Sequence, residues 1–313
     1  MAARVLLPLL FLAACAPAVA PRNAPPPDQP LPVVAERFVT QFRGAEGITF
    51  NGEGRLFVGA NNQIWEILPD GSTRRLADVY RHLGQAGIGP RDILAADFGP
   101  TNIFGDGASS RNDGVIWRFT PEGERTVFAT GIADPNAIIR LPGGTWLVSD
   151  DGVHDIYRIV DGRAEIWSRA VPFPNGMALS RDGRTLYVAQ IFSAVGPVVV
   201  DTAIWAIPIR NDRPAGPGRI VARTERAPDG LVADEYGRIY IADNGSGTIR
   251  RYDPTTGEMV IIARDMPSVA SLVFGEGQFD PLSIYVTSTA GREGRGGTIW
   301  RVRVGVRGAR PHR

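Results

Sequence analysis

Short stretches of alternating hydrophobic and polar residues recur along most of this chain, and turn residues separate them. Each repeat reads as an apolar strand, a turn that contains glycine, a second apolar strand and a third strand that ends in a polar turn. Thr185–Val188 and Ser283–Val286 are typical second strands, and Gln63–Ile67 is a typical third strand. Alternation with a period of two is typical of half-buried β-strands. We therefore expect an all-β protein.

The repeat occurs in six copies, and four of them carry proline in the same register. The copies begin at Ala45, Pro90, Pro135, Pro174, Pro228 and Ala270. A single Pro-Asn-Gly or Pro-Asp-Gly would be an ordinary turn signal. A period of about 40 to 50 residues with about four short strands per copy is instead typical of a β-propeller. The sequence therefore predicts a six-bladed β-propeller over residues 36–305.

Equivalent residues of successive blades lie at the same height around the axis of a propeller, so the second residue of each copy should face the channel mouth. These residues are Glu46, Arg91, Asn136, Asn175, Asp229 and Ser271. Four of the six carry a carboxylate or an amide, and no histidine or cysteine joins them. Oxygen donors of this kind suit a hard divalent cation such as Ca²⁺, whereas zinc prefers nitrogen and sulfur. We expect a central metal site with Ca²⁺ or another divalent cation.

Composition agrees with this fold and narrows the partners. The 37 glycines and 25 prolines among 313 residues favour many short strands joined by tight turns over a helical bundle. The formal net charge is only +1, so the chain has no long-range electrostatic field that would attract nucleic acid. We expect a small-molecule partner.

The N-terminus has the pattern of an export signal, because Met1–Arg4 precedes a short apolar run that ends at Ala14. Leu12-Ala13-Ala14-Cys15 resembles the lipobox of bacterial lipoproteins. We expect residues 1–15 to be a lipoprotein-type signal peptide with Cys15 lipidated, and the protein to be exported and held at the bacterial envelope through this lipid alone. Cleavage by an ordinary signal peptidase after Ala20 is the alternative. Residues 16–35 are predicted to be a proline-rich disordered tether and residues 306–313 a basic tail.

Several motifs together resemble the SMP-30/gluconolactonase/luciferin-regenerating-enzyme family of calcium-dependent six-bladed propellers. The most specific are Pro174-Asn175-Gly176, which is followed by Ser180–Ala189, and Pro228-Asp229-Gly230-Leu231; Ala45-Glu46-Gly47 and Ile284–Ser288 support them. The resemblance implies that Glu46, Asn175 and Asp229 bind the metal. It also implies that Asn136 is a further ligand or a substrate contact.

The same resemblance implies a calcium-dependent lactonase or ester hydrolase. Asp229 would act as base or as nucleophile while the ion polarises the carbonyl, and the sequence leaves both roles open. Arg91 is expected either to orient an anionic group or to help stabilise the oxyanion in catalysis, or else to be a solvated or structural arginine. Ser271 is expected to contact substrate. Members that hydrolyse sugar lactones usually carry Glu-Gly-Pro and Asn-Asp where this chain has Glu46-Gly47-Ile48 and Asn136-Ala137, so the substrate is left open. The alternatives are a non-catalytic envelope propeller with a structural metal and a strictosidine-synthase-like enzyme.

Overall fold

The computed structural model describes residues 25–26, 29–100, 112–289 and 297–310. The predicted signal peptide and Cys15 lie outside these residues. Apart from the short 3-10 helix η2 (Asn244–Ser246), the regular elements of the described residues are β-strands, which confirms the all-β prediction. None of the described helical structure has the length and apolar character needed to cross a bilayer.

The described strands group into six antiparallel units of four strands, which we number from the N-terminus. The first unit consists of β2 (Ala45–Phe50), β3 (Leu56–Ala60), β4 (Gln63–Ile67) and β5 (Thr73–Asp78). The second consists of β6 (His82–Ile88), β7 (Asp92–Asp97), β8 (Gly114–Phe119) and β9 (Arg125–Ile132). The third consists of β10 (Pro135–Arg140), β11 (Trp146–Asp150), β12 (Asp155–Val160) and β13 (Arg163–Ser168).

The fourth unit consists of β14 (Pro174–Leu179), β15 (Thr185–Gln190), β18 (Ala203–Arg210) and β20 (Arg219–Arg223), with β16 (Phe192–Val195), β17 (Val198–Val200) and β19 (Arg213–Pro214) as additions. The fifth consists of β21 (Pro228–Ala233), β22 (Ile239–Asp243), β23 (Thr248–Tyr252) and β24 (Met259–Ala263). The sixth combines β25 (Val269–Phe274), β26 (Ser283–Ser288) and β27 (Ile299–Arg303) with β1 (Ala35–Val39).

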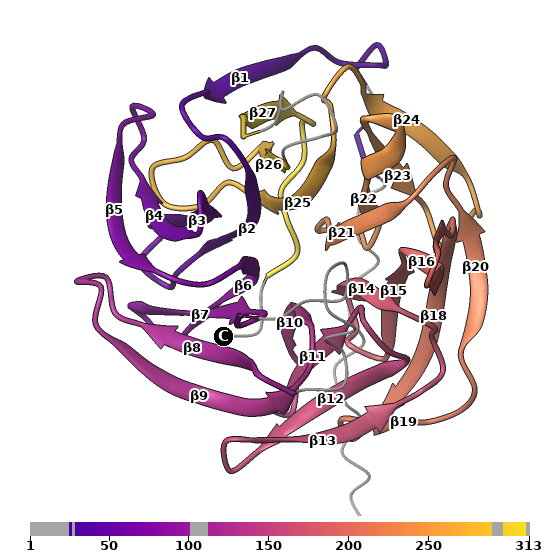
Figure 1. The fold of residues 1–313 in the computed structure, drawn as a ribbon. Coiled ribbons are helices and arrows are strands. Elements are labelled where there is room, and N and C mark those ends of the chain that lie inside the picture. The colour runs from indigo at the N-terminus through magenta and orange to yellow at the C-terminus, as the bar shows by residue number, and fades with distance from the viewer. Residues whose placement is uncertain (1–24, 27–28, 101–111, 290–296, 311–313) are drawn as a thin grey trace, which may run out of the picture.

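The units follow one another around a central axis, and the first strand of each lies innermost (Figure 1). β1 pairs with β27, so a strand from the start of the chain completes the sheet made by its end. The second and third units are linked into one eight-stranded sheet by a single parallel pair, Arg163 with Thr130. Pairing of the two chain ends holds the ring closed.

All six innermost strands carry the same irregularity. In each, the first residue pairs with the last residue of the second strand, and regular pairing resumes only at the fourth residue. A bulge re-aims the side chains within it. The second residue of each innermost strand, which we call the ring position, lies inside this bulge. The ring positions are occupied by Glu46, Leu83, Asn136, Asn175, Asp229 and Ala270.

Adjacent innermost strands touch through the residue that follows each ring position. In four units this residue is glycine, and a Cβ there would lie 1.9–2.6 Å from the carbonyl oxygen of the next unit's ring residue; these are Gly47, Gly84, Gly176 and Gly230. In the other two units a hydroxyl bridges the gap. Ser149 donates to the carbonyl of Asn175 at 2.8 Å, and Thr287 donates to the carbonyl of Glu46. The spacing of the ring is therefore set by backbone contact.

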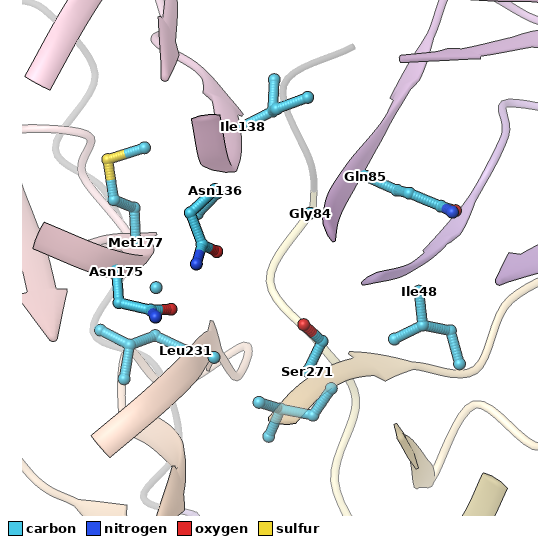
Figure 2. A pocket seen from close by; sticks show the side chains of 13 residues that line it. Ile48, Gly84, Gln85, Asn136, Ile138, Asn175, Met177, Leu231 and Ser271 are labelled. Atoms are coloured by element: carbon cyan, nitrogen blue, oxygen red, sulfur yellow. The ribbon is translucent and has the colours of Figure 1, made fainter. Parts of the chain in front are cut away.

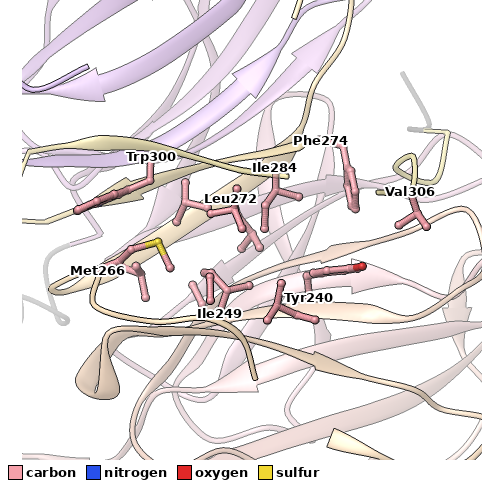
Figure 3. Packing of buried hydrophobic residues seen from close by; sticks show 14 residues of the cluster. Tyr240, Ile249, Met266, Leu272, Phe274, Ile284, Trp300 and Val306 are labelled. Carbon is pink, nitrogen blue, oxygen red and sulfur yellow. The ribbon is translucent and has the colours of Figure 1, made fainter. Parts of the chain in front are cut away.

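Apolar clusters fill the space between adjacent units. The largest joins the fifth and sixth units and includes Tyr240, Phe274 and Trp300, with the rings of Tyr240 and Phe274 5.5 Å apart (Figure 3). Val306, beyond the last strand, is 4% exposed and belongs to the same cluster. Burial between units, and not within a single sheet, stabilises the ring.

Described residues on both sides of the predicted propeller bounds contact the fifth and sixth units. Within the predicted tether, Leu31 and Val33 pack on the cluster between the fifth and sixth units, and Val33 N donates to the carbonyl of Ile262 at 2.7 Å. At the other end, Ala309 N donates to the carbonyl of Ala233 at 2.9 Å. The folded part therefore starts before residue 36 and continues past residue 305, because apolar residues before and after these bounds pack against the fifth and sixth units.

Candidate metal centre

Four of the predicted residues occupy ring positions, one in each of four different units. They are Glu46 on β2, Asn136 on β10, Asn175 on β14 and Asp229 on β21. The last three are 5%, 2% and 4% exposed, whereas Glu46 is partly exposed. The bulge and the contacts between innermost strands bring these side chains to one end of the central channel.

A cavity of about 80 Å³ lies in the channel next to the ring. Asn136, Asn175 and Ser271 line it together with apolar residues that follow the bulges, such as Ile48, Met177 and Leu231. Figure 2 shows Asn136 and Asn175 side by side, with the Ser271 hydroxyl pointing into the same space from another strand. The cavity is thus polar at the ring and apolar beyond it.

Two of the six sequence-based ring assignments are wrong. Arg91 lies in the turn between β6 and β7, at the opposite end of the innermost strand, where its exposed guanidinium pairs with Glu122 at 2.5 Å. The second unit places Leu83 at the ring position. Arg91 therefore lies away from the ring that it was predicted to join.

The assignment of the sixth unit is displaced by one residue. Ala270 occupies the ring position, and Ser271 follows it, with its backbone N donating to Thr287 Oγ1 at 2.9 Å. Ser271 nevertheless lines the cavity, so its predicted contact with substrate stays a prediction. The second and sixth units contribute no side-chain oxygen at the ring position itself.

Asp151 is a buried carboxylate that the sequence reasoning missed. It follows β11, is 5% exposed, and its Oδ2 accepts a 2.9 Å hydrogen bond from Nδ2 of Asn136. Its Oδ1 has no hydrogen-bond partner within the described residues. The only signal in the sequence was the pair Asp150-Asp151 at the end of an apolar strand, which resembles an ordinary turn.

Asn244 is a second residue that the sequence reasoning missed. Its Nδ2 donates to Oδ2 of Asp229 at 3.2 Å. Asn244 belongs to the short helix η2 after β22, in the loop position that corresponds to Asp151 after β11. Two ring residues therefore have their side chains oriented by a partner from a neighbouring loop.

The site concentrates negative charge, and within the part of the chain that the structure describes no basic side chain forms an ion pair with it. Burial raises the pKa of Glu46 to about 7. Burial, followed by repulsion from Glu46 and Asp151, raises the pKa of Asp229 well above its usual value. Burial and repulsion from neighbouring carboxylates also raise the pKa of Asp151 well above its usual value, although the hydrogen bond from Asn136 acts in the other direction. No arginine of the described residues forms an ion pair with these three.

The donor set fits a hard divalent cation. Oδ1 of Asn175 is buried and has no hydrogen-bond partner among the described residues, although buried polar atoms of native proteins are nearly always satisfied. A cation at the ring would satisfy this oxygen and relieve the repulsion among the carboxylates. Among the described residues no three His, Cys, Asp or Glu side chains cluster as a metal-ligand set; the candidate set has two carboxylates and two amides.

Comparison with known proteins confirms the family resemblance predicted from the sequence. Residues 143–290 match the family model described as the SMP-30/Gluconolactonase/LRE-like region. This region holds Asn175, Asp229, Asp151 and Asn244, whereas Glu46 and Asn136 lie outside it and are brought to the ring by the fold.

Among curated proteins, the pentonolactonase XacC of Haloferax volcanii is 31% identical over 176 residues, which are 55% of this chain and 56% of that protein. The match thus spans about half the length of this relative. Its name describes a lactone hydrolase.

Solved structures show the same fold at low identity. A calcium-binding regucalcin from Agrobacterium tumefaciens superposes with a TM-score of 0.71 at 18% identity, over 88% of this chain and 96% of that one. A gluconolactonase from Xanthomonas campestris gives 0.67 at 19% identity, over 86% and 89% of the two chains. A luciferin-regenerating enzyme gives 0.69 at 15% identity, over 90% of this chain and 100% of that one.

Proposed function

We propose that this protein is a divalent-metal-dependent hydrolase of small lactones or esters, built as a six-bladed β-propeller, and that the metal is calcium. The observation that carries the proposal is the ring of Glu46, Asn136, Asn175 and Asp229. Among the described residues, Oδ1 of Asn175 is buried without a hydrogen-bond partner and no basic side chain forms an ion pair with the ring. The lactonase names of the similar proteins support the reaction class.

Each ring residue has a defined part in this proposal. Glu46 and Asp229 supply the charge that holds a divalent ion, and Asn175 and Asn136 supply neutral oxygens. When bound, the ion would act as a Lewis acid toward a carbonyl oxygen. Asp151 accepts from Nδ2 of Asn136 and so leaves the amide oxygen of Asn136 available to the channel.

Asp229 is the proposed acid–base group or nucleophile. Asn244 fixes the plane of its carboxylate by donating to Oδ2. Burial and the neighbouring carboxylates raise the pKa of Asp229, which makes its carboxylate a stronger base toward water. The apolar side chains beyond the ring, including Met177 and Leu231, limit the access of bulk water to this group.

The test is hydrolysis of a panel of sugar lactones, aryl esters and phosphotriesters, with calcium and with chelator. We expect activity on at least one lactone or ester, loss of that activity with chelator and recovery on adding calcium. Asp229→Asn should lower kcat by at least about 10³-fold, as removal of a catalytic carboxylate usually does. The matched control is Asp161→Asn, in an exposed turn. Activity that survives both chelator and Asp229→Asn would refute the proposal.

We also propose that the protein is exported and anchored to the bacterial envelope by a lipid on Cys15. The support is the apolar run before the lipobox-like Leu12-Ala13-Ala14-Cys15. Cys15→Ser should release the protein from the membrane fraction of cells. Unchanged membrane association of this variant would contradict the anchor.

A further inference from the structure

A second, larger cavity of about 580 Å³ opens beside the ring, at the first and second units. It is lined by Arg43 and Gly44 before β2, by Asn61 and Asn62 in the turn between β3 and β4, and by His82 at the start of β6. Gly44 lies two residues before Glu46, and His82 lies one residue before Leu83. The cavity therefore adjoins the proposed metal centre on the same end of the channel.

The β3–β4 turn fixes one wall of this cavity. Asn61 and Asn62 both have left-handed backbone angles, with φ of 56° and 58°, as a two-residue hairpin turn requires. Oδ1 of Asn61 accepts a 2.8 Å hydrogen bond from the backbone N of Arg43. This bond ties the segment before β2 to the turn and turns the amide NH₂ of Asn61 away from that segment.

The opposite wall is His82, whose imidazole rests on β3 where Gly59 has no side chain. A Cβ on Gly59 would lie within 2.7–2.9 Å of Cβ, Cδ2 and Cγ of His82. The Nδ1 atom of His82 is buried and has no hydrogen-bond partner among the described residues. His82 is thus held against β3 at the wall of the cavity.

The chemistry of the cavity is that of an anion site. Its lining contains a guanidinium, two carboxamides and an imidazole, and no carboxylate. Within the described residues no ion pair involves Arg43, which is exposed. The planar guanidinium of arginine matches a carboxylate in geometry and charge. Arg43 lies three residues before Glu46, so positive and negative charge are separated over a short distance.

The arrangement of ring positions indicates how a substrate would reach this cavity. Leu83 and Ala270 lie on either side of Glu46 in the ring, so a ligand that extends from the ring toward the second unit meets no further ring oxygen. A small molecule whose carbonyl lies at the ring and whose other end extends toward the second unit would meet His82 and Arg43.

We propose that this cavity binds the anionic group of the substrate, and that the substrate is a lactone or ester that carries a free carboxylate. The inference rests on the proposed function for the reaction at the ring. The cavity itself can be tested for anion binding without any hydrolysis.

The binding test uses the purified full chain with [¹³Cε1]-histidine, whose three histidines give three resonances, and His82→Gln assigns the signal of His82. Succinate at neutral pH is the probe, and succinamide is its uncharged counterpart. We expect succinate to shift the His82 resonance saturably and succinamide to leave it in place. Arg43→Gln should weaken succinate binding at least tenfold, whereas Arg163→Gln, an exposed arginine on β13, should not change it.

Kinetics then separate this inference from the proposed function. On any lactone or ester that is hydrolysed, we expect a carboxylate-bearing substrate to be preferred over its methyl ester, and Arg43→Gln to reduce that preference at least tenfold through KM. Succinate binding that is equal in Arg43→Gln and the parent protein would overturn the anion site. Hydrolysis without any preference for the charged substrate would overturn the substrate class while leaving the hydrolase intact. If succinate binds through Arg43 but no substrate is hydrolysed, the proposed hydrolase function is refuted and the proposed anion site is supported.

Discussion

The side-chain amide of Asn136 donates a 2.9 Å hydrogen bond to Oδ2 of Asp151, and both residues are buried. Asn136 sits at a ring position on β10, whereas Asp151 lies in the loop after β11. The bond fixes which end of the Asn136 amide faces the channel. It also adds a third carboxylate to the surroundings of Glu46 and Asp229, so Asp151 should favour a bound cation and disfavour the metal-free fold.

Asp151→Asn is expected to change metal affinity and metal-free stability in opposite directions. Calcium affinity should fall about 10-fold, as is usual when a residue that orients a ligand is lost. The melting temperature in chelator should rise by roughly 2–4 °C, because a buried, repelled carboxylate has been neutralised. Calorimetric calcium titration and thermal melts measure the two effects. Asp161→Asn is the control, and a variant that loses metal affinity without gaining metal-free stability would contradict this account of Asp151.

Calcium should stabilise the protein more at pH 7.5 than at pH 5.5. Burial raises the pKa of Glu46 from its usual 4.5 to about 7, so the folded, metal-free chain retains a proton that the unfolded chain has lost. The stability contributed by this group is present below pH 4.5 and is lost as the pH rises through 7. A bound cation offsets this loss of stability, because it interacts favourably with the ionised carboxylate. Melting temperatures of the parent protein and of Glu46→Gln, each with chelator and with calcium at the two pH values, measure this stabilisation. An equal rise in the melting temperature of the parent protein on adding calcium at both pH values would count against the proposed metal site at the ring.

His82 should produce the opposite pH dependence. Burial lowers the pKa of its imidazole from 6.5 to about 4, although the charge of Asp97 acts in the other direction. The unfolded chain binds this proton and the folded chain does not, so the stability contributed by His82 is present above pH 6.5 and is lost as the pH falls toward 4. His82→Gln should lose less stability than the parent protein between pH 6.5 and pH 4.5. Chemical denaturation at the two pH values measures the difference, and parallel losses in both proteins would show that His82 is not the group responsible.

Gly176→Ala should disrupt the ring more than the addition of a single methyl group would suggest. The added Cβ would lie 2.1 Å from the carbonyl oxygen of Asp229 and 2.7 Å from Cα of Gly230, and backbone atoms cannot move aside as a side chain can. We expect a loss of about 3 kcal/mol or more in the free energy of unfolding, together with weaker calcium binding. Gly216→Ala is the control, because the nearest atom is Cγ of Pro208 at 3.3 Å. Similar stability of the two variants by urea denaturation would contradict the close contact of innermost strands.

The signals that predicted the ring positions of the oxygen-bearing residues are local ones. Pro135-Asn136, Pro174-Asn175 and Pro228-Asp229 each start a strand whose first residue enters a bulge, and the side chain after proline occupies the ring position. Proline also misled the interpretation, since Pro90-Arg91 resembles these pairs but follows an innermost strand. The true innermost strand of the second unit, His82–Ile88, has no proline at its start. Whether a strand is first or second in its unit depends on what lies at the axis, and a short stretch of sequence does not contain that information.

The sequence by itself determined the all-β class, the repeat and four oxygen-bearing ring residues, because strand alternation and turn chemistry are short-range properties. Only the tertiary structure decided that Leu83 and Ala270 complete the ring, that Arg91 lies away from it, and that Asp151 orients Asn136. These relationships join residues in different strands and loops, and backbone contacts between neighbouring units set them. A residue in a turn and a residue at the channel mouth can carry the same local sequence, and packing around the axis tells them apart.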